Sequence, residues 1–237
     1  MSRGLPTPAV RPRRILVVNP NTNPLVTSRV RAMADRCESA GVTFEVINPA
    51  AGPFSIESES DKRQAEVEVL NLIGSKAYLD YDAYVLACFD DLALQAVRQM
   101  VAVPVIGCCQ AGIEAARAVS PALAIVTTVD AAVPGIDRMM KRYGAGDLAS
   151  VRAAGIGVDD AARAQPQAQA RLQQAIAQAI AQDGAQVILL ASGGLTGQAD
   201  RIGAQAGVPV IDAVEAALRQ AARVCAQGSV PAQPVNA

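Results

Sequence analysis

The sequence contains no histidine and no tryptophan, and aromatic residues make up only 3% of its 237 positions. The absence of histidine removes the commonest general base, the Ser-His-Asp and Cys-His nucleophile pairs, and most zinc-site patterns. Any chemistry must therefore use Cys, Asp, Glu, Lys, Tyr or backbone groups, and we expect no metal site.

The sequence also lacks an excess of positive or negative charge. The formal net charge is -1, and Lys and Arg form no cluster beyond Arg11, Arg13 and Arg14, so the footprint of a nucleic-acid-binding protein is absent. No apolar run approaches the roughly 18 residues of a membrane span, and the first residues lack the apolar core of a signal peptide. We expect a cytoplasmic protein that binds a small molecule, not nucleic acid or membrane, with residues 1–13 as a disordered tail.

Apolar runs of strand length alternate with helical patterns along the chain. Hydrophobic residues make up 51% of the sequence, and Ala, Val, Ile and Leu dominate, which is typical of buried parallel strands under Ala-rich helices. The alternation predicts an α/β fold with parallel sheets and right-handed crossovers. The predicted strands cover residues 15–18, 42–47, 84–87, 103–107, 123–127, 187–191 and 208–211, with a short one near 151. Helices are predicted between them, including 91–101, 111–119, 133–143, 197–206 and 213–226.

One pattern occurs twice. The run YVLAC at 84–88, a helix and the run VPVI at 103–106 are echoed by VILLAS at 187–192, a helix and VPVI at 208–211. The repeat predicts two similar lobes with Cys88 and Ser192 at equivalent strand ends, although VPVI is common enough for chance to be the alternative. We expect residues 14–110 plus 213–237 to form one lobe, residues 111–212 to form the other, and the active site to lie in the cleft between them.

Polar and nucleophilic residues gather at the predicted carboxyl ends of strands, where open parallel sheets bind ligands. The thiol of Cys88 precedes a helix expected to begin near Asp90 or Asp91, a position that can lower a thiol pKa from about 8.5 toward neutrality. The two aspartates would cap that helix and raise the thiol pKa again. The alternative reading of Cys88 is a buried small hydrophobe. The other candidates at strand ends are Ser192, the turn Asn19-Pro20-Asn21-Thr22, Thr127, Thr128, and the backbone groups of Gly193 and Gly194.

The remaining cysteines fit other roles. An odd number of five, with no export signal, argues against a disulfide framework. Cys37 and Cys225 lie on the apolar stripes of their helices and are expected in the core. Cys108 and Cys109 follow a strand and could touch the cleft, but their spacing matches neither a metal site nor a redox pair.

Several segments in the same order resemble the hydantoin and allantoin racemases of the aspartate/glutamate racemase superfamily, and the resemblance extends over nearly the whole chain from Ile15. The matching segments are Asn19-Pro20-Asn21-Thr22, Gly52 to Ser58, Ala87-Cys88-Phe89 with Asp91, Val126-Thr127-Thr128, Val133 to Ile136, and Ser150 to Ala153. The resemblance implies a two-lobed fold, a homo-oligomer and a racemase or epimerase that works without a cofactor. Its substrate would be a hydantoin- or allantoin-like molecule that reacts at the carbon beside a carbonyl.

The resemblance also implies a pair of cysteines facing each other across the substrate. Cys88 matches the first, but the turn that carries the second reads Ala191-Ser192-Gly193-Gly194, and Gln110 stands where an acidic residue is expected. A hydroxyl is a far weaker acid than a thiol, and no His can activate it. Three alternatives therefore stay open: a single-cysteine decarboxylase of substituted malonates, a maleate-type isomerase with a nucleophilic cysteine, and a ligand-binding homologue without catalysis.

Overall fold

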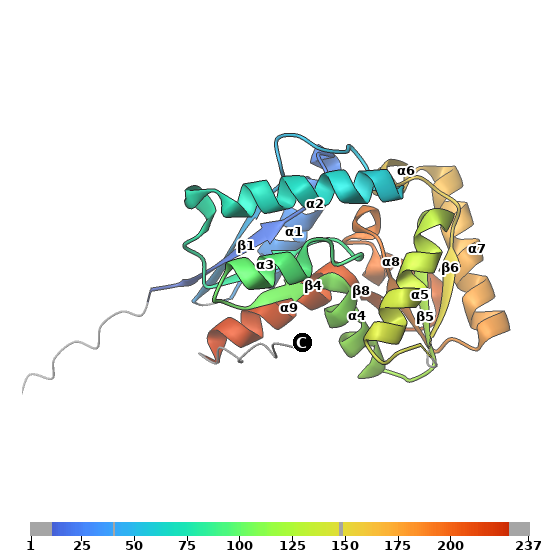
Figure 1. Cartoon of the computed structure of the whole chain (residues 1–237). Helices are drawn as coiled ribbons and strands as arrows, with labels where there is room; N and C mark the ends of the chain where they lie inside the picture. Colours follow the sequence, from blue (N-terminus) through green and yellow to red (C-terminus); the bar gives the residue numbers. More distant parts are fainter. Residues whose placement is uncertain (1–10, 40, 147–148, 228–237) are drawn as a thin grey trace, which may run out of the picture.

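The computed structural model describes residues 11–39, 41–146 and 149–227, and these fold around two four-stranded parallel sheets (Figure 1). The first sheet has the order β2-β1-β3-β4 and the second has the order β6-β5-β7-β8. The strands of the first are β1 Arg13–Val18, β2 Val42–Ile47, β3 Ala83–Leu86 and β4 Val105–Gly107. Those of the second are β5 Leu123–Thr127, β6 Ala149–Ala153, β7 Val187–Leu190 and β8 Val210–Asp212. The matching orders confirm the predicted α/β fold with two sheets.

Helices cover both sheets. They are α1 Pro24–Cys37, α2 Glu59–Gly74, α3 Leu94–Met100, α4 Cys108–Arg117, α5 Val133–Arg142, α6 Val158–Ala162, α7 Pro166–Asp183, α8 Ala199–Ala206 and α9 Ala213–Ala226, with 3₁₀ turns at Lys76–Tyr78, Asp130–Ala132 and Gly193–Leu195. Buried side chains of α2 and α3 pack on one face of the first sheet, and those of α7 and α8 on one face of the second. None of the helices in these ranges has the length and apolar character needed to cross a bilayer.

A central core joins the two sheets. It contains Ile15 and Val85 of the first sheet, Ile125 and Leu189 of the second, and side chains of α1, α4, α5 and α9. The fit is close at Gly112 of α4, where a Cβ atom would lie 2.9 Å from Cδ1 of Leu189. Cys37 and Cys225 belong to this core, as their apolar stripes predicted. The shared core holds the carboxyl ends of the two sheets in a fixed relation.

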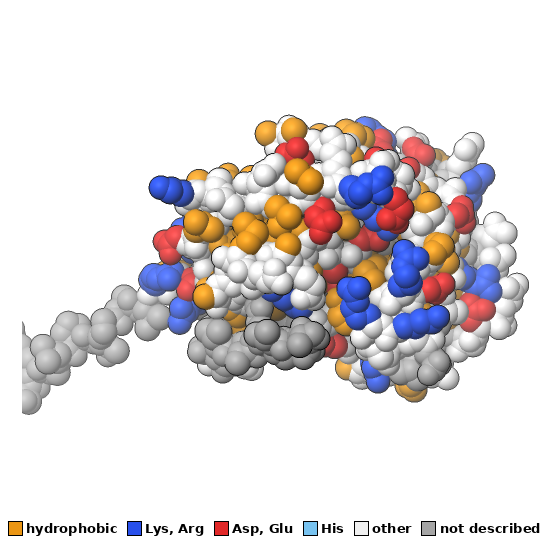
Figure 2. Space-filling model, in the orientation of Figure 1, with side chains coloured by type: hydrophobic (Ala, Val, Ile, Leu, Met, Phe, Trp, Pro, Cys, Tyr) orange, Lys and Arg blue, Asp and Glu red, His pale blue; other side chains and the backbone are white. Residues whose placement is uncertain are grey.

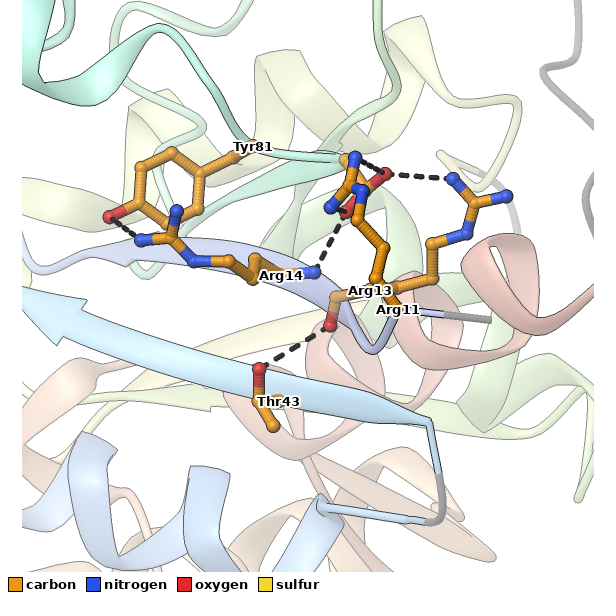
Figure 3. A network of polar contacts seen from close by, with 6 residues as sticks. Arg11, Arg13, Arg14, Thr43 and Tyr81 are labelled. Atoms are coloured by element: carbon orange, nitrogen blue, oxygen red, sulfur yellow. Dashed lines mark hydrogen bonds and ion pairs between the residues drawn. The ribbon is translucent and has the colours of Figure 1, made fainter. Parts of the chain in front are cut away.

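Ion pairs hold the first described residues in place. Arg11 and Arg13 both form ion pairs with the Asp82 carboxylate, at 3.0 and 2.8 Å, and Arg14 stacks on the ring of Tyr81 (Figure 3). Burial raises the pKa of Asp82, but the backbone N–H of Arg14 and the Arg13 and Arg11 guanidinium groups together lower it. Residues 11–13, which were predicted to belong to a disordered tail, are therefore held in place, and Arg13 begins β1. The rest of the predicted tail, residues 1–10, lies outside the described residues. On the face shown in Figure 2, charges of both signs are intermixed.

Several helices differ from expectation. The one predicted at 111–119, for example, is α4 at Cys108–Arg117. The helix predicted at 91–101 begins only at Leu94, because the chain first makes a turn in which Asp91 and Ala93 have positive φ angles of 48° and 61°. The short helix α6 was not predicted at all. Its first residue, Val158, donates its N–H to Oε1 of Glu57 at 2.8 Å, a contact between residues far apart in the sequence that no local pattern reveals.

Candidate active site

A pocket opens where the carboxyl ends of the two sheets meet. It brings together Cys88 and Ser192 with four of the predicted binding residues, Asn21, Thr127, Thr128 and Gly193. The other residues of its wall were not predicted as individual binding residues, although Pro20 belongs to a predicted turn and Ile56, Ala87 and Phe89 stand in segments that carry the family resemblance. These others are Pro20, Ile56, Ala87, Phe89, Asp90, Val129, Ala132, Val158 and Ala191.

Cys88 and Ser192 occupy equivalent positions in the two sheets. Val18 pairs with Leu86 in the first sheet, and Val126 pairs with Leu190 in the second. Cys88 lies two residues beyond Leu86, and Ser192 lies two residues beyond Leu190. The repeat read from the sequence therefore corresponds to a repeat in strand register, and both side chains border the same pocket.

Cys88 alone among the five cysteines is partly exposed; the other four are buried. Burial among neighbouring atoms raises the pKa of its thiol, and the negative charge of Asp90 raises it further. The N–H of Asp90, which donates to the sulfur, and the ammonium group of Lys62 act in the opposite direction but are weaker. Of the two opposing effects expected on the thiol pKa, the one that raises it prevails, because no helix begins at Cys88 and the local charge is negative. The resting thiol is protonated at neutral pH.

Asp90 forms an ion pair with a lysine that is not part of the pocket wall. Nζ of Lys62 in α2 lies 2.7 Å from Oδ1 of Asp90, and both side chains are mostly buried. Gly135 of α5 leaves room for this pair, since a Cβ atom there would lie 3.3 Å from Nζ of Lys62. The pair places a carboxylate beside the thiol and engages the nearby ammonium group. In the described structure, Asp90 is the one charged residue of the pocket wall.

Asp91 was expected to cap the helix after Cys88, but it caps α4. Its Oδ1 accepts the N–H of Cys109 at 3.0 Å, and Oδ2 accepts the hydroxyl of Tyr143 at 2.7 Å. Gly107 makes this approach possible, because a Cβ atom there would lie 2.4 Å from Oδ1 of Asp91. Burial raises the pKa of Asp91 to about 6 despite these hydrogen bonds. Cys108 and Cys109 begin α4 and are fully buried, outside the pocket wall.

Ser192 receives two hydrogen bonds. The hydroxyl of Thr128 donates to its Oγ at 3.2 Å, and the N–H of Gly194 donates at 3.3 Å. The neighbouring Thr127 donates its hydroxyl to the carbonyl of Ala191 at 3.0 Å. The end of β5 thus fixes both the backbone and the hydroxyl at the end of β7.

Three predicted binding residues lie outside the pocket wall and support it. Asn19 is fully buried, and its Nδ2 donates to Asn21 at 3.0 Å and to Thr27 at 2.9 Å. Thr22 donates its N–H to the carbonyl of Pro53 at 2.9 Å. Gly194 packs so tightly that a Cβ atom would lie 2.4 Å from the carbonyl oxygen of Val158. Strand-end position identified the right segments but not which side chains face the pocket.

The described residues contain no group of three or more His, Cys, Asp or Glu side chains arranged to hold a metal ion. Groups at the pocket that can give or take a proton include the Cys88 thiol, the Ser192 hydroxyl with its two donors, and the ion-paired carboxylate of Asp90.

Comparison with known proteins shows the family to which the chain belongs. Residues 15–221 match the family model described as Asp/Glu/Hydantoin racemase. A hydantoin racemase of Rhizobium meliloti is 34% identical over 215 residues, which cover 90% of this chain and 89% of that protein. A hydantoin racemase of Paenarthrobacter aurescens is 34% identical over 217 residues, covering 91% of this chain and 92% of that one. The solved structure of an allantoin racemase from Klebsiella pneumoniae superposes with a TM-score of 0.88 at 30% identity, covering 94% of this chain and 91% of that one. The chain therefore belongs to the Asp/Glu/hydantoin racemase family and is an enzyme of the isomerase class.

Proposed function

We propose that the protein racemises a hydantoin- or allantoin-like substrate and that Cys88 transfers the proton at the carbon beside the carbonyl. The observation that carries the proposal is the placement of Cys88 and Ser192 at equivalent strand ends around one pocket. Racemisation requires proton transfer on two faces of one carbon, which suits two groups from two similar lobes. The names of the relatives supply the substrate class.

The charge of the pocket favours a neutral ring as the substrate, in preference to a substituted malonate. A substituted malonate brings two carboxylates, which need cationic or multiple N–H partners. The described wall contributes Asp90 and no Lys or Arg, and the nearby Lys62 is already paired with Asp90 and with Glu59. A ring with amide N–H groups meets no such repulsion and can donate a hydrogen bond to a carboxylate. The decarboxylase alternative therefore gains no support from the pocket.

In the proposed mechanism the thiolate form of Cys88 removes the α-proton as a base. The electron pair passes into the adjacent carbonyl and gives an enolate, which hydrogen-bond donors at the pocket stabilise. The raised pKa of Cys88 means that few molecules hold the thiolate at neutral pH, but each thiolate is a strong base. Proton return from the opposite side completes inversion, and Ser192 is the proposed donor on that side.

Substrate binding is assigned by the same proposal. Asn21, Thr127, Thr128 and Gly193 border the pocket, while Asn19, Thr22 and Gly194 hold the wall behind them. The two-lobe boundaries, 14–110 plus 213–237 and 111–212, also stay proposals, as do a homo-oligomeric assembly, a cytoplasmic location and activity without a cofactor.

The test uses single enantiomers of 5-substituted hydantoins and of allantoin in D₂O. Chiral chromatography follows inversion, and NMR follows loss of the α-proton signal; an enzyme-free reaction measures spontaneous racemisation. We expect enzyme-dependent exchange accompanied by inversion. Release of carbon dioxide from arylmalonates without exchange of hydantoins would instead identify a decarboxylase, and binding without turnover would identify a non-catalytic homologue.

A further inference from the structure

We propose that Thr128 is a positioning residue that makes the Ser192 hydroxyl a usable proton donor in place of a second thiol. The inference rests on the proposed racemase function and deepens it. It assigns to Thr128 a role through Ser192 in addition to its place in the pocket wall, and it explains how a hydroxyl can serve on the second face.

The hydrogen bonds at Ser192 decide where its proton points. A serine hydroxyl has one proton to donate and two lone pairs that accept. The Thr128 hydroxyl and the Gly194 N–H both donate to Ser192 Oγ, so its accepting positions are occupied. The proton of Ser192 is left for a partner in the pocket that the residue borders.

Thr128 is itself fixed. Its side chain is 2% exposed, and its carbonyl accepts the N–H of Ile156 at 3.0 Å. The neighbouring hydroxyl of Thr127 is bound to Ala191 next to Ser192. A buried, anchored donor keeps its hydrogen bond during the reaction without reorganisation, which is the condition under which such a bond stabilises developing charge most.

The equivalent position in the other lobe has no such donor. Pro20 corresponds to Thr128 as Cys88 corresponds to Ser192, because Pro20 and Thr128 lie two residues beyond the equivalent strand residues Val18 and Val126. Pro20 and Cys88 both line the pocket. Proline has neither an N–H nor a side-chain donor. Within the described ranges, the N–H of Asp90 is the donor to Cys88, whereas Ser192 has the matching N–H of Gly194 and a hydroxyl as well. The weaker acid of the pair has the extra donor.

The proton balance follows from this asymmetry. Cys88 thiolate takes the α-proton and becomes a thiol, and the electron pair enters the enolate. Ser192 gives its hydroxyl proton to the opposite face of that carbon and becomes an alkoxide, which the two donors hold. Solvent returns a proton to the alkoxide and takes one from the thiol, which restores both groups. Loss of the Thr128 hydroxyl weakens only the step in which Ser192 donates its proton, and not the step in which Cys88 removes one.

A test that needs no substrate measures the acidity of a thiol placed at position 192. The double variant Cys88→Ala/Ser192→Cys is alkylated with iodoacetamide across pH, and modification of the peptide containing residue 192 is followed by mass spectrometry. Adding Thr128→Val should raise the apparent thiol pKa by about one unit, because it removes a hydrogen bond to the charged form. Thr128→Ser, which keeps the hydroxyl, should leave the profile unchanged. The inference would be overturned if the variants with Thr and with Val at position 128 gave the same dependence of alkylation on pH.

The second measurement is catalytic. In the otherwise native chain, Thr128→Val should lower inversion of a hydantoin about 10- to 100-fold, with a smaller loss of α-proton exchange on the Cys88 side. Thr128→Ser should restore inversion. Equal loss of both rates would indicate a merely structural role, and Thr128→Ala replaces the Val variant if the latter does not fold. If the native protein neither exchanges nor inverts any substrate, the proposed function fails, while the alkylation profiles still decide the inference.

Discussion

The hydroxyl of Tyr143, at the end of α5, donates a 2.7 Å hydrogen bond to Oδ2 of Asp91, in the turn that follows Cys88. This contact links a helix of the second half of the chain to the segment that carries the candidate thiol. Asp91 in turn holds the start of α4 through the N–H of Cys109. The position of Cys88 therefore depends on contacts made by residues on both sides of the pocket.

Tyr143→Phe should lower the free energy of unfolding by about 1.5–3 kcal/mol, because it removes one charge-assisted hydrogen bond from a buried carboxylate. Urea denaturation at pH 7.5 measures the change. Tyr84→Phe is the matched control, since its hydroxyl donates to a neutral carbonyl, that of Tyr78, at 2.7 Å; its cost should be nearer 1 kcal/mol. A Tyr143 variant no less stable than the control variant would contradict this account of the turn.

A second buried carboxylate gives a pH-dependent prediction. Burial raises the pKa of Asp212 to about 6, although Gly197, Val214 and Glu215 donate backbone N–H groups to it. A raised folded-state pKa means that the native protein binds the proton more tightly than the unfolded chain. Its contribution to stability is therefore full below about pH 4 and is lost as pH rises through about 6.

Asp212→Asn removes this titration. The stability deficit of the variant relative to the native protein should be largest near pH 4, shrink between about pH 4 and 6, and level off at higher pH. Denaturation curves at half-unit pH intervals give the difference directly, and other titrating groups cancel in it. Parallel stability profiles for the two proteins would show that Asp212 does not titrate in this range.

The sequence predicted the strand ends well because each buried strand is a short apolar run that ends at a polar residue or a turn. Equivalence of Cys88 and Ser192 followed from the repeated pattern and agrees with the strand register. The environment of Cys88 was not predictable in the same way. The pKa of its thiol is raised chiefly by burial and then by the charge of Asp90, and both follow from contacts between distant parts of the chain, such as the Asp90–Lys62 pair. Asp91 likewise caps α4 instead of the helix predicted after Cys88.

The raised thiol pKa predicts the pH dependence of activity. The rate constant kcat/KM should rise about tenfold per unit between pH 6 and 8, because only the thiolate of Cys88 removes the proton. Asp90→Asn should displace the profile toward lower pH, since it removes the negative charge beside the sulfur and leaves Lys62 in place. A flat profile between pH 6 and 8 would mean that the thiol is already ionised.

Ser192→Cys restores the second thiol of the family pattern. A thiol is a much stronger acid and base than a hydroxyl, so inversion should rise by about tenfold or more while exchange on the Cys88 side changes little. Chiral chromatography and NMR in D₂O on one sample give both rates. Ser192→Ala should lower inversion and retain exchange. Unchanged inversion in the Cys variant with every hydantoin tried would count against the hydantoin assignment.

The most direct test of the central claim is α-proton exchange by Cys88→Ala, measured by NMR in D₂O with a hydantoin that the native protein turns over. Cys37→Ala is the control, because its thiol is buried in the core away from the pocket and its loss should leave exchange intact. The account predicts that Cys88→Ala reduces enzyme-dependent exchange at least about 100-fold while the protein remains folded. Exchange at the native rate in Cys88→Ala would contradict it.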